Sequence, residues 1–302
     1  MTCSSMAMEV GEPLAGTAPL ADAWVVIEQP GSWGTKALQD ADLPAGVGPA
    51  IAAAAAGTGV GVLLARHPDR TVRDRPDGHA GHRVWIASVR PGLEELRHGV
   101  VEDLSAVTSW DFPAIAAGRL PALDAPAPPA LLLVCTQGGR DACCARIGRP
   151  LIQGLLDDCR PPDRELLWEA SHIGGHRFAP TVLALPTGAV HGRLDPGQAV
   201  DVLQATMRGE IELTGLRGRS ALPAAAQAAE IAIRAHTGER GTACLSVTSS
   251  QTENDQARVA LSHQDGRSWS VELRRVQLPR PRPESCGAEA VIGFAWHVLS
   301  VH

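Results

Sequence analysis

Two short motifs hold the residues most able to do chemistry. Eight residues separate Cys135 from Cys144, and three separate His172 from His176. Together the pairs supply two soft sulfur donors and two nitrogen donors. This is a four-ligand set for either a zinc ion or an iron–sulfur cluster with mixed ligation. The sequence therefore predicts a metal centre built from these four side chains.

The cysteine pair spans the junction between an expected strand and an expected helix. Cys135 follows the apolar run 130–134, which is typical of a strand buried on both faces. Cys144 falls in the first turns of a helix expected over 141–156, whose N-terminus favours negative charge such as that of thiolates. Two glycines between the cysteines let the backbone approach a bulky group. An isolated cysteine pair is more often apolar packing, so the second motif decides the interpretation.

The histidine pair brackets two glycines, Gly174 and Gly175. Such a segment is too rich in glycine for a stable helix, so we expect a loop after a strand at 166–170. A loop can direct both imidazoles at one centre. A lone pair of histidines at this spacing is a weak signal, but its combination with the cysteine pair predicts metal ligation.

The rest of the chain is expected to form α/β structure around this centre. Residues 1–120 read as a small N-terminal α/β unit, and 121–129, with four prolines, as a linker. Residues 215–302 read as an α+β antiparallel segment. The elements expected outside the centre are strands at 23–29, 60–65, 83–89, 243–247, 257–262 and 268–276, and helices at 47–56 and 224–235.

Residues 130–214 are expected to carry both motifs in one domain. Its order is strand, helix, three strands and a closing helix, with a hairpin of 181–185 and 189–193 and the last helix at 196–207. Pro150 is expected to kink the first helix or divide it in two. This order resembles a thioredoxin-like core that lacks one helix.

The motifs resemble those of a known family, the sucrase/ferredoxin-like proteins, whose ferredoxin part belongs to the thioredoxin-like [2Fe-2S] ferredoxins. The resemblance is carried by CTQGGRDACC at 135–144, WEASHIGGHRFAP at 168–180, GRL at 192–194, WVVIEQP at 24–30 and, more weakly, LRGRS at 216–220. In the branch that this chain resembles, a histidine pair replaces the second cysteine pair.

The resemblance implies a cofactor and its ligands. Cys135 and Cys144 would hold one iron of a [2Fe-2S] cluster, and His172 and His176 the other. Cys143 directly precedes Cys144, so either thiolate could be the ligand, and the spacing favours Cys144. Nothing supports the sucrase in the family's name, because no paired carboxylates are placed for glycoside hydrolysis.

This ligand set has a redox consequence. Two thiolates and two neutral imidazoles bring an oxidised cluster to zero charge, whereas four thiolates would leave it doubly negative. Reduction is then easier, and each imidazole has a second nitrogen that can exchange a proton. We therefore expect a one-electron, proton-coupled carrier, either an electron-transfer protein or a small reductase, that works with an unidentified redox partner protein.

Two other functions use the same residues. A structural zinc site with two cysteines and two histidines would make the chain a scaffold or interaction protein. A thioredoxin-like thiol-redox protein would use Cys135 with Cys143 or Cys144, but it lacks the usual two-residue spacing and leaves both histidines without a role.

The net charge and the sequence pattern argue against some binding partners and some cellular locations. The net charge of −6 over 302 residues argues against nucleic-acid binding, which needs a basic surface. We see neither a signal peptide nor an apolar stretch of the ~20 residues that span a bilayer, so we expect a cytoplasmic protein without membrane contact. Seven scattered cysteines, an odd number, favour metal ligation or packing over a disulfide framework.

Overall fold

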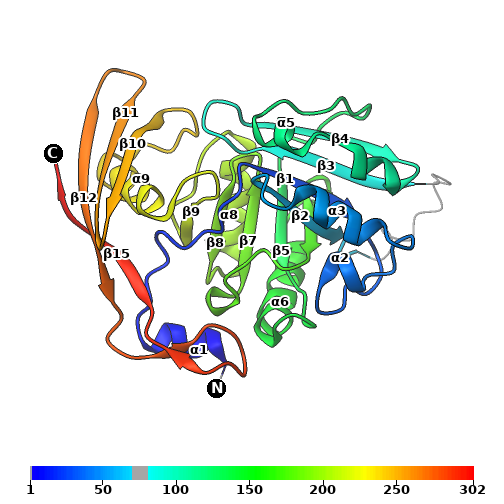
Figure 1. Ribbon diagram of the computed structural model, residues 1–302, viewed down its shortest axis with the longest axis horizontal. Coiled ribbons are helices and arrows are strands. Elements are labelled where there is room, and N and C mark those ends of the chain that lie inside the picture. Colours follow the sequence, from blue (N-terminus) through cyan, green and yellow to red (C-terminus); the bar gives the residue numbers. More distant parts are fainter. Residues whose placement is uncertain (1, 70–80) are drawn as a thin grey trace.

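The protein is a mixed α/β structure with one large mixed sheet and a separate antiparallel sheet (Figure 1). The computed structural model describes residues 2–69 and 81–302. The large sheet has nine strands in the order β4-β3-β1-β2-β6-β5-β7-β8-β9. Its strands are β1 (Ala23–Glu28), β2 (Val60–Arg66), β3 (His82–Ser88), β4 (Glu95–Val101), β5 (Leu131–Cys135), β6 (Leu167–Ala170), β7 (Thr181–Leu185), β8 (Ala189–Gly192) and β9 (Leu216–Arg219).

The expected N-terminal unit and the expected core share this sheet. Strands β2 and β6 join the two halves through only two antiparallel partner pairs, Ala65 with Ala170 and Arg66 with Glu169. Arg66 and Glu169 also form an ion pair of 2.6 Å. The proline-rich segment 121–129 contains no helix or strand beyond a single bridge from Ala125 to His98, and the sheet continues on both sides of it.

Helices cover the sheet where its strands present apolar side chains. In the N-terminal half these are α2 (Ala37–Asp40), α3 (Val47–Ala55), the 3₁₀ helix η1 (Leu104–Ser109) and α5 (Phe112–Ala116). In the second half they are α6 (Ala142–Asp158), α7 (Pro161–Arg164) and α8 (Pro196–Met207). Along β5, Leu132 and Val134 pack toward α6 and α8, while Leu133 and Cys135 belong to the core on the opposite face. This alternation fixes the face on which the first ligand lies.

Of the two effects expected of Pro150, a kink or a division of the helix, division does not occur, because α6 runs through Pro150 as one helix. Pro150 is exposed, so the carbonyl that loses its hydrogen bond can turn to water. Leu151, Ile152 and Leu155 on the opposite side are buried and hold the helix against the sheet.

The second sheet forms the expected antiparallel appendage. Its strands are β10 (Leu245–Glu253), β11 (Gln256–His263), β12 (Ser268–Gln277) and β15 (Phe294–Val301), and α9 (Ala224–Thr237) packs against it. The sequence did not predict β15, which closes this sheet. It also placed 216–219 in the appendage, whereas these residues form β9 of the large sheet.

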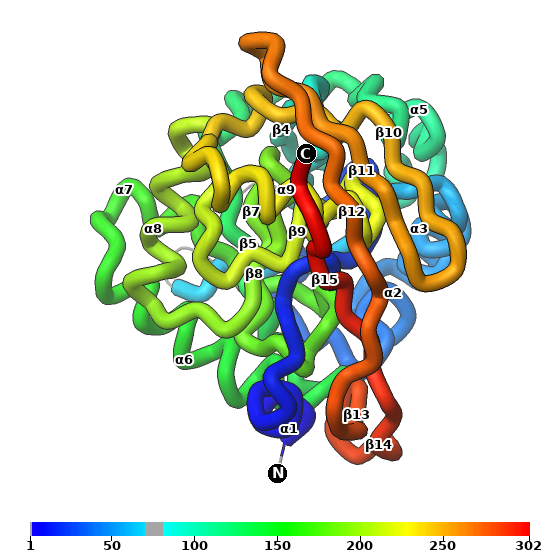
Figure 2. Tube along the Cα trace, turned by 90° about the vertical axis from the view of Figure 1, so that its left-hand side faces the viewer, coloured from blue at the N-terminus to red at the C-terminus, as the bar shows by residue number. Residues whose placement is uncertain are grey.

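Two short segments far apart in sequence lie side by side below the large sheet. They are α1 (Cys3–Glu9) and the small sheet of β13 (Arg282–Pro283) and β14 (Ala290–Val291), and both views show them together (Figures 1 and 2). Helix α1 also contacts the 3₁₀ helix η2 (His176–Phe178). No helix in the described part of the chain combines the length and the apolar character that a bilayer crossing needs.

Candidate metal centre

Three of the four predicted ligands meet at the ends of neighbouring strands. Cys135 ends β5, Cys144 lies in the first turn of α6, and His172 follows β6. His172 Nδ1 lies 4.0 Å from Cys135 Sγ and 3.9 Å from Cys144 Sγ. The three donor atoms all lie within 4.8 Å of one another, and both cysteines are buried. Parallel pairing of β5 with β6 explains this convergence, because it puts the ends of both strands at one edge.

His176 lies beside this group without joining it. Its ring centroid is 5.0 Å from that of His172, with 35° between the ring planes. His176 Nε2 lies 3.6 Å from Asp141 Oδ2, and the buried Nδ1 has no hydrogen-bond partner among the described residues. Burial lowers the pKa of His176, which favours the neutral imidazole. Nδ1 is therefore the nitrogen left available for a metal.

The pKa values of the two thiols shift in opposite directions. A hydrogen bond from Cys144 lowers the pKa of Cys135 well below its ordinary value, despite the burial that opposes it. The same hydrogen bond, together with burial, raises the pKa of Cys144. This hydrogen bond favours the thiolate form at Cys135 and the thiol form at Cys144. A thiolate is the form that binds metals.

Sulfur and nitrogen donors suit a metal centre, and the distances between the donor atoms bear on whether they hold one ion or a two-iron cluster. Bond lengths of ~2.3 Å to sulfur and ~2.0 Å to nitrogen put two donors on one tetrahedral ion about 3.5 Å apart. The two Cys–His distances are close to this value. Donors on two neighbouring irons lie farther apart, so His172 must turn away from the thiols to hold a second iron. His172 is only partly buried, and its side chain can turn about its own side-chain torsions.

Two side chains that the sequence did not single out as site residues hold the histidine loop. Gln137 Oε1 accepts a hydrogen bond of 2.8 Å from the backbone N–H of His172. The buried Arg217 donates to Gly174 O at 2.9 Å, and burial lowers its pKa to about 9. Gly175 has φ +73°, and a Cβ there would lie 2.3 Å from Arg217 Nη2. The loop therefore needs glycine at this position.

Asp141 links the centre to its surroundings. Its expected role was only to begin the helix, and it does cap α6 by accepting the backbone N–H of Cys143 at 2.8 Å. It also accepts the N–H of Cys286 at 2.8 Å and faces His176. Burial raises its pKa, but the two backbone N–H groups outweigh burial and the net shift is downward. Asp141 is therefore a buried carboxylate next to the fourth predicted ligand.

Cys143 faces a different group from Cys144. Its Sγ lies 3.4 Å from that of Cys3 and 3.3 Å from that of Cys286. Adjacent residues of a helix point about 100° apart, so the two thiols cannot both face Cys135. Among the two candidates, Cys144 is the one that the structure places beside Cys135 and His172.

The region that holds this centre matches a known family. The profile of the Sucrase/ferredoxin-like family matches residues 14–218. The chain belongs to the Sucrase/ferredoxin-like family. The matched region includes all four predicted ligands and Arg217, whereas Cys3 and Cys286 lie outside it. No curated protein and no solved structure matches this Sucrase/ferredoxin-like chain.

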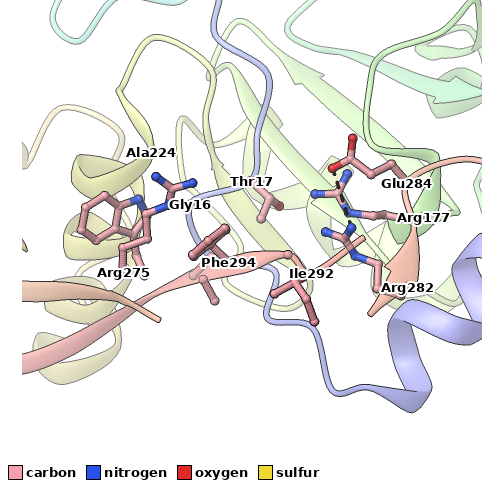
Figure 3. Close-up of a pocket in the computed structure, with 13 residues that line it drawn as sticks. Gly16, Thr17, Arg177, Ala224, Arg275, Arg282, Glu284, Ile292 and Phe294 are labelled. Atoms are coloured by element: carbon pink, nitrogen blue, oxygen red, sulfur yellow. Dashed lines mark ion pairs between the residues drawn. The ribbon is translucent and has the colours of Figure 1, made fainter. Parts of the chain in front are cut away.

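Segments outside the matched region cover the histidine side of the centre. Glu12 follows α1 and is buried; it accepts hydrogen bonds from Arg177 at 2.9 Å and from Arg282 at 2.6 Å. Arg177 and Arg282 also line a cavity of about 470 Å³ beneath β15, where Arg282 Nη1 lies 3.7 Å from Glu284 (Figure 3). A residue of the N-terminal segment, Glu12, and a residue of the C-terminal segment, Arg282, thus meet at the residue that follows His176.

Proposed function

We propose that the protein is a one-electron carrier whose [2Fe-2S] cluster is held by Cys135, Cys144, His172 and His176. The observation that supports it best is the convergence of two thiols and one imidazole at the ends of adjacent strands, inside the region matched by the family profile. The mixed donor set has one known use in iron–sulfur proteins, in which nitrogen ligands raise the reduction potential.

A thioredoxin-like core for residues 130–214 is part of this proposal. Its support is the strand order β6-β5-β7-β8, in which β5 is parallel to β6 and antiparallel to β7. Helices α6 and α8 pack together on one face of these strands. This arrangement agrees with the element order expected from the sequence.

The chain supplies an asymmetric environment for electron and proton exchange. When bound, the cluster accepts and releases a single electron. Cys135 and Cys144 are each 1 % exposed, whereas the His176 side chain is 12 % exposed. Protons therefore exchange on the histidine side, where Asp141 holds the Nε2 edge of His176. The thiols supply the two negative charges that balance the oxidised cluster.

The electron is exchanged with a partner protein. The loop between the two cysteines is exposed at residues 138–140, beside a cavity of about 550 Å³ whose lining includes Arg66 and Arg149. Arg66 is neutralised by Glu169, but Arg149 and the exposed Arg140 of the same loop can attract an acidic redox protein and raise its rate of association. We propose this edge as the place of electron entry.

The test is electron paramagnetic resonance of the dithionite-reduced protein, with iron and sulfide determined on the same sample. We expect a one-electron [2Fe-2S] signal and a red-brown colour that bleaches on reduction. The variant with His172→Ala and His176→Ala should lose both, while a control, His236→Ala, changes an exposed histidine at the end of α9 and should keep them. A colourless, iron-free protein from iron-replete cells would refute the proposal.

One observation favours a second candidate, a structural zinc site. The donors of Cys135, Cys144 and His172 are close enough to share one ion without any movement. Zinc is colourless and gives no paramagnetic signal, so the same experiment separates the two candidates. Zinc in equal amount to the chain, lost from the two-histidine variant, would identify this alternative.

A further inference from the structure

A second group of cysteine side chains lies next to the candidate centre, because one of its members, Cys143, directly precedes Cys144. The Sγ atoms of Cys3, Cys143 and Cys286 are 3.4, 3.3 and 3.6 Å apart. Cys3 and Cys143 are 1 % and 0 % exposed. Both carboxylate oxygens of Asp141 lie 3.9 Å from Cys3 Sγ. Four potential ligand atoms from three distant segments therefore lie within 4.8 Å of one another.

The three distances are those of sulfurs around one ion. A disulfide would bring two sulfurs to ~2.05 Å and leave the third aside. Three thiolates at ~2.3 Å from a tetrahedral ion are about 3.8 Å apart. The three separations are nearly equal and close to this second value. All three thiols are free, and they face one another.

We propose that Cys3, Cys143 and Cys286, with one carboxylate oxygen of Asp141, bind a single Zn²⁺ ion. Three cysteines and one oxygen donor complete a closed tetrahedral shell, as in structural zinc sites. Each Asp141 oxygen already accepts one backbone hydrogen bond and has a lone pair left for the ion. This ion is separate from the [2Fe-2S] cluster, and the inference does not rest on the proposed function.

The surroundings favour the negative charge that such a shell carries. Asp141 and Cys143 lie at the N-terminus of α6, a helix of 17 residues whose dipole stabilises anions there. The backbone N–H of Ser4 points at Cys143 Sγ.

The ion would hold together the segments that lie over the histidine side of the candidate centre, and we call it the clamp for this reason. It joins α1 and the turn between β13 and β14, which lie side by side in Figure 2, to Cys143 at the start of α6. Asp141 would then touch the zinc with its carboxylate, while Oδ2 of the same group lies 3.6 Å from Nε2 of His176. Metal binding at this site would therefore fix the helix that contacts η2 and place a zinc-bound carboxylate beside one predicted iron ligand.

The experiment measures zinc and iron separately in the full chain, purified under reducing conditions without chelator. The variants are Cys3→Ser and Cys286→Ser. The matched control is Cys159→Ala, which removes a buried thiol at the end of α6 that contacts neither cluster. We expect about one zinc per chain, at least a ~10-fold loss in both Ser variants, and no loss in the control or in iron.

A second measurement needs no variant. Stripping zinc from the unmodified protein with a chelator should raise amide exchange in α1 and in residues 282–291 and leave exchange in β5 unchanged. Unaltered zinc in Cys3→Ser, no zinc uptake by the unmodified chain, or a disulfide among the three cysteines in the reduced preparation would each overturn the proposal. If zinc also occupies the candidate centre, the unmodified chain holds two ions and Cys3→Ser one, which refutes the carrier but supports the clamp.

Discussion

Cys143 and Cys144 are neighbours at the start of α6, yet their sulfur atoms belong to different groups. Cys144 Sγ lies 3.9 Å from His172 Nδ1, and Cys143 Sγ lies 3.3 Å from Cys286 Sγ. One helical turn thus contributes a ligand to each of two candidate metal sites. The same turn is capped by Asp141, which contacts residues of both.

This separation predicts opposite effects of two adjacent substitutions. Cys144→Ser should abolish the cluster, with iron per chain falling at least ~10-fold, because a hydroxyl is a poor replacement for a thiolate on iron. Cys143→Ser should keep iron and lose zinc. Metal analysis and visible absorption check both. Equal loss of iron in the two variants would mean that the thiols act on one centre.

Exchanging the histidines for cysteine should lower the reduction potential. The double change His172→Cys and His176→Cys replaces two neutral donors with two thiolates, which makes the oxidised centre doubly negative. The potential should then fall from the histidine-ligated range of about −150 to +300 mV toward about −400 mV, and its pH dependence should vanish. Potentiometric titration at two pH values gives the result. A potential that stays in place would argue against histidine ligation.

Asp141→Asn should leave the helix intact but change both sites. Asparagine can still cap α6 by accepting the N–H of Cys143, but its amide group leaves the N–H of Cys286 without an acceptor, so we expect a loss of about 1–3 kcal/mol of stability. The loss of the carboxylate beside His176 Nε2 should raise the reduction potential, and zinc affinity should fall at least ~10-fold. Asp195→Asn, which alters the cap of α8 far from both groups, serves as the control and should change neither quantity.

Gly148→Ala should destabilise the fold and disturb the cysteine at the end of β5. A Cβ at 148 would lie 2.2 Å from the carbonyl oxygen of Cys135, so the helix or the strand must shift. We expect a loss of about 1–3 kcal/mol of stability, which exceeds the ~1 kcal/mol gain in helix propensity. The control Gly197→Ala meets no atom closer than 3.5 Å and should be neutral or stabilising. Thermal unfolding compares the two.

His191 should make the protein less stable in mild acid. It is fully buried in β8, and burial lowers its pKa to about 4, against an ordinary value of 6.5. Between about pH 6.5 and pH 4 the unfolded chain therefore binds a proton at this histidine, whereas the folded chain does not. The contribution is fully present above about pH 6.5 and is lost as the pH falls toward 4, by about 3 kcal/mol for a pKa of about 4 in the folded protein.

The variant His191→Gln isolates this contribution. Glutamine can still donate to Thr214 O, the partner of His191 Nδ1, but it does not titrate. Denaturant unfolding at about pH 7 and pH 4.5 should show a smaller acid loss in this variant than in the unmodified protein. His297→Gln changes an exposed histidine and should leave the difference unchanged.

Local patterns predicted the elements that carry the main motif. The apolar run before Cys135 became β5, and the helix after it became α6. Helix α8 and the hairpin of β7 with β8 also appear where alternation and capping residues placed them. These features arise from burial and caps within a few residues, which a single sequence records.

Long-range relationships could not be predicted in this way. Cys3 and Cys286 come together although 283 positions separate them, and neither has a partner at a recognisable spacing. Strands β2 and β6 join the halves of the sheet through two pairs of residues, too few to leave a pattern. The sequence placed Asp141 only at the start of the expected helix, because its contacts with His176 and Cys286 exist only in the folded chain.

Helix α1 packs against η2 and β13, and residues near both of its ends hold it there. Ser4 Oγ donates to Ala179 O at 3.2 Å, and Glu12 binds Arg177 and Arg282. A protease that nicks the irregular stretch at 13–22 would leave α1 held by such side-chain contacts and would loosen the segment that packs against η2, where His176 lies. Preparations that have been clipped there should bleach in air sooner than intact ones, even though every iron ligand is still present.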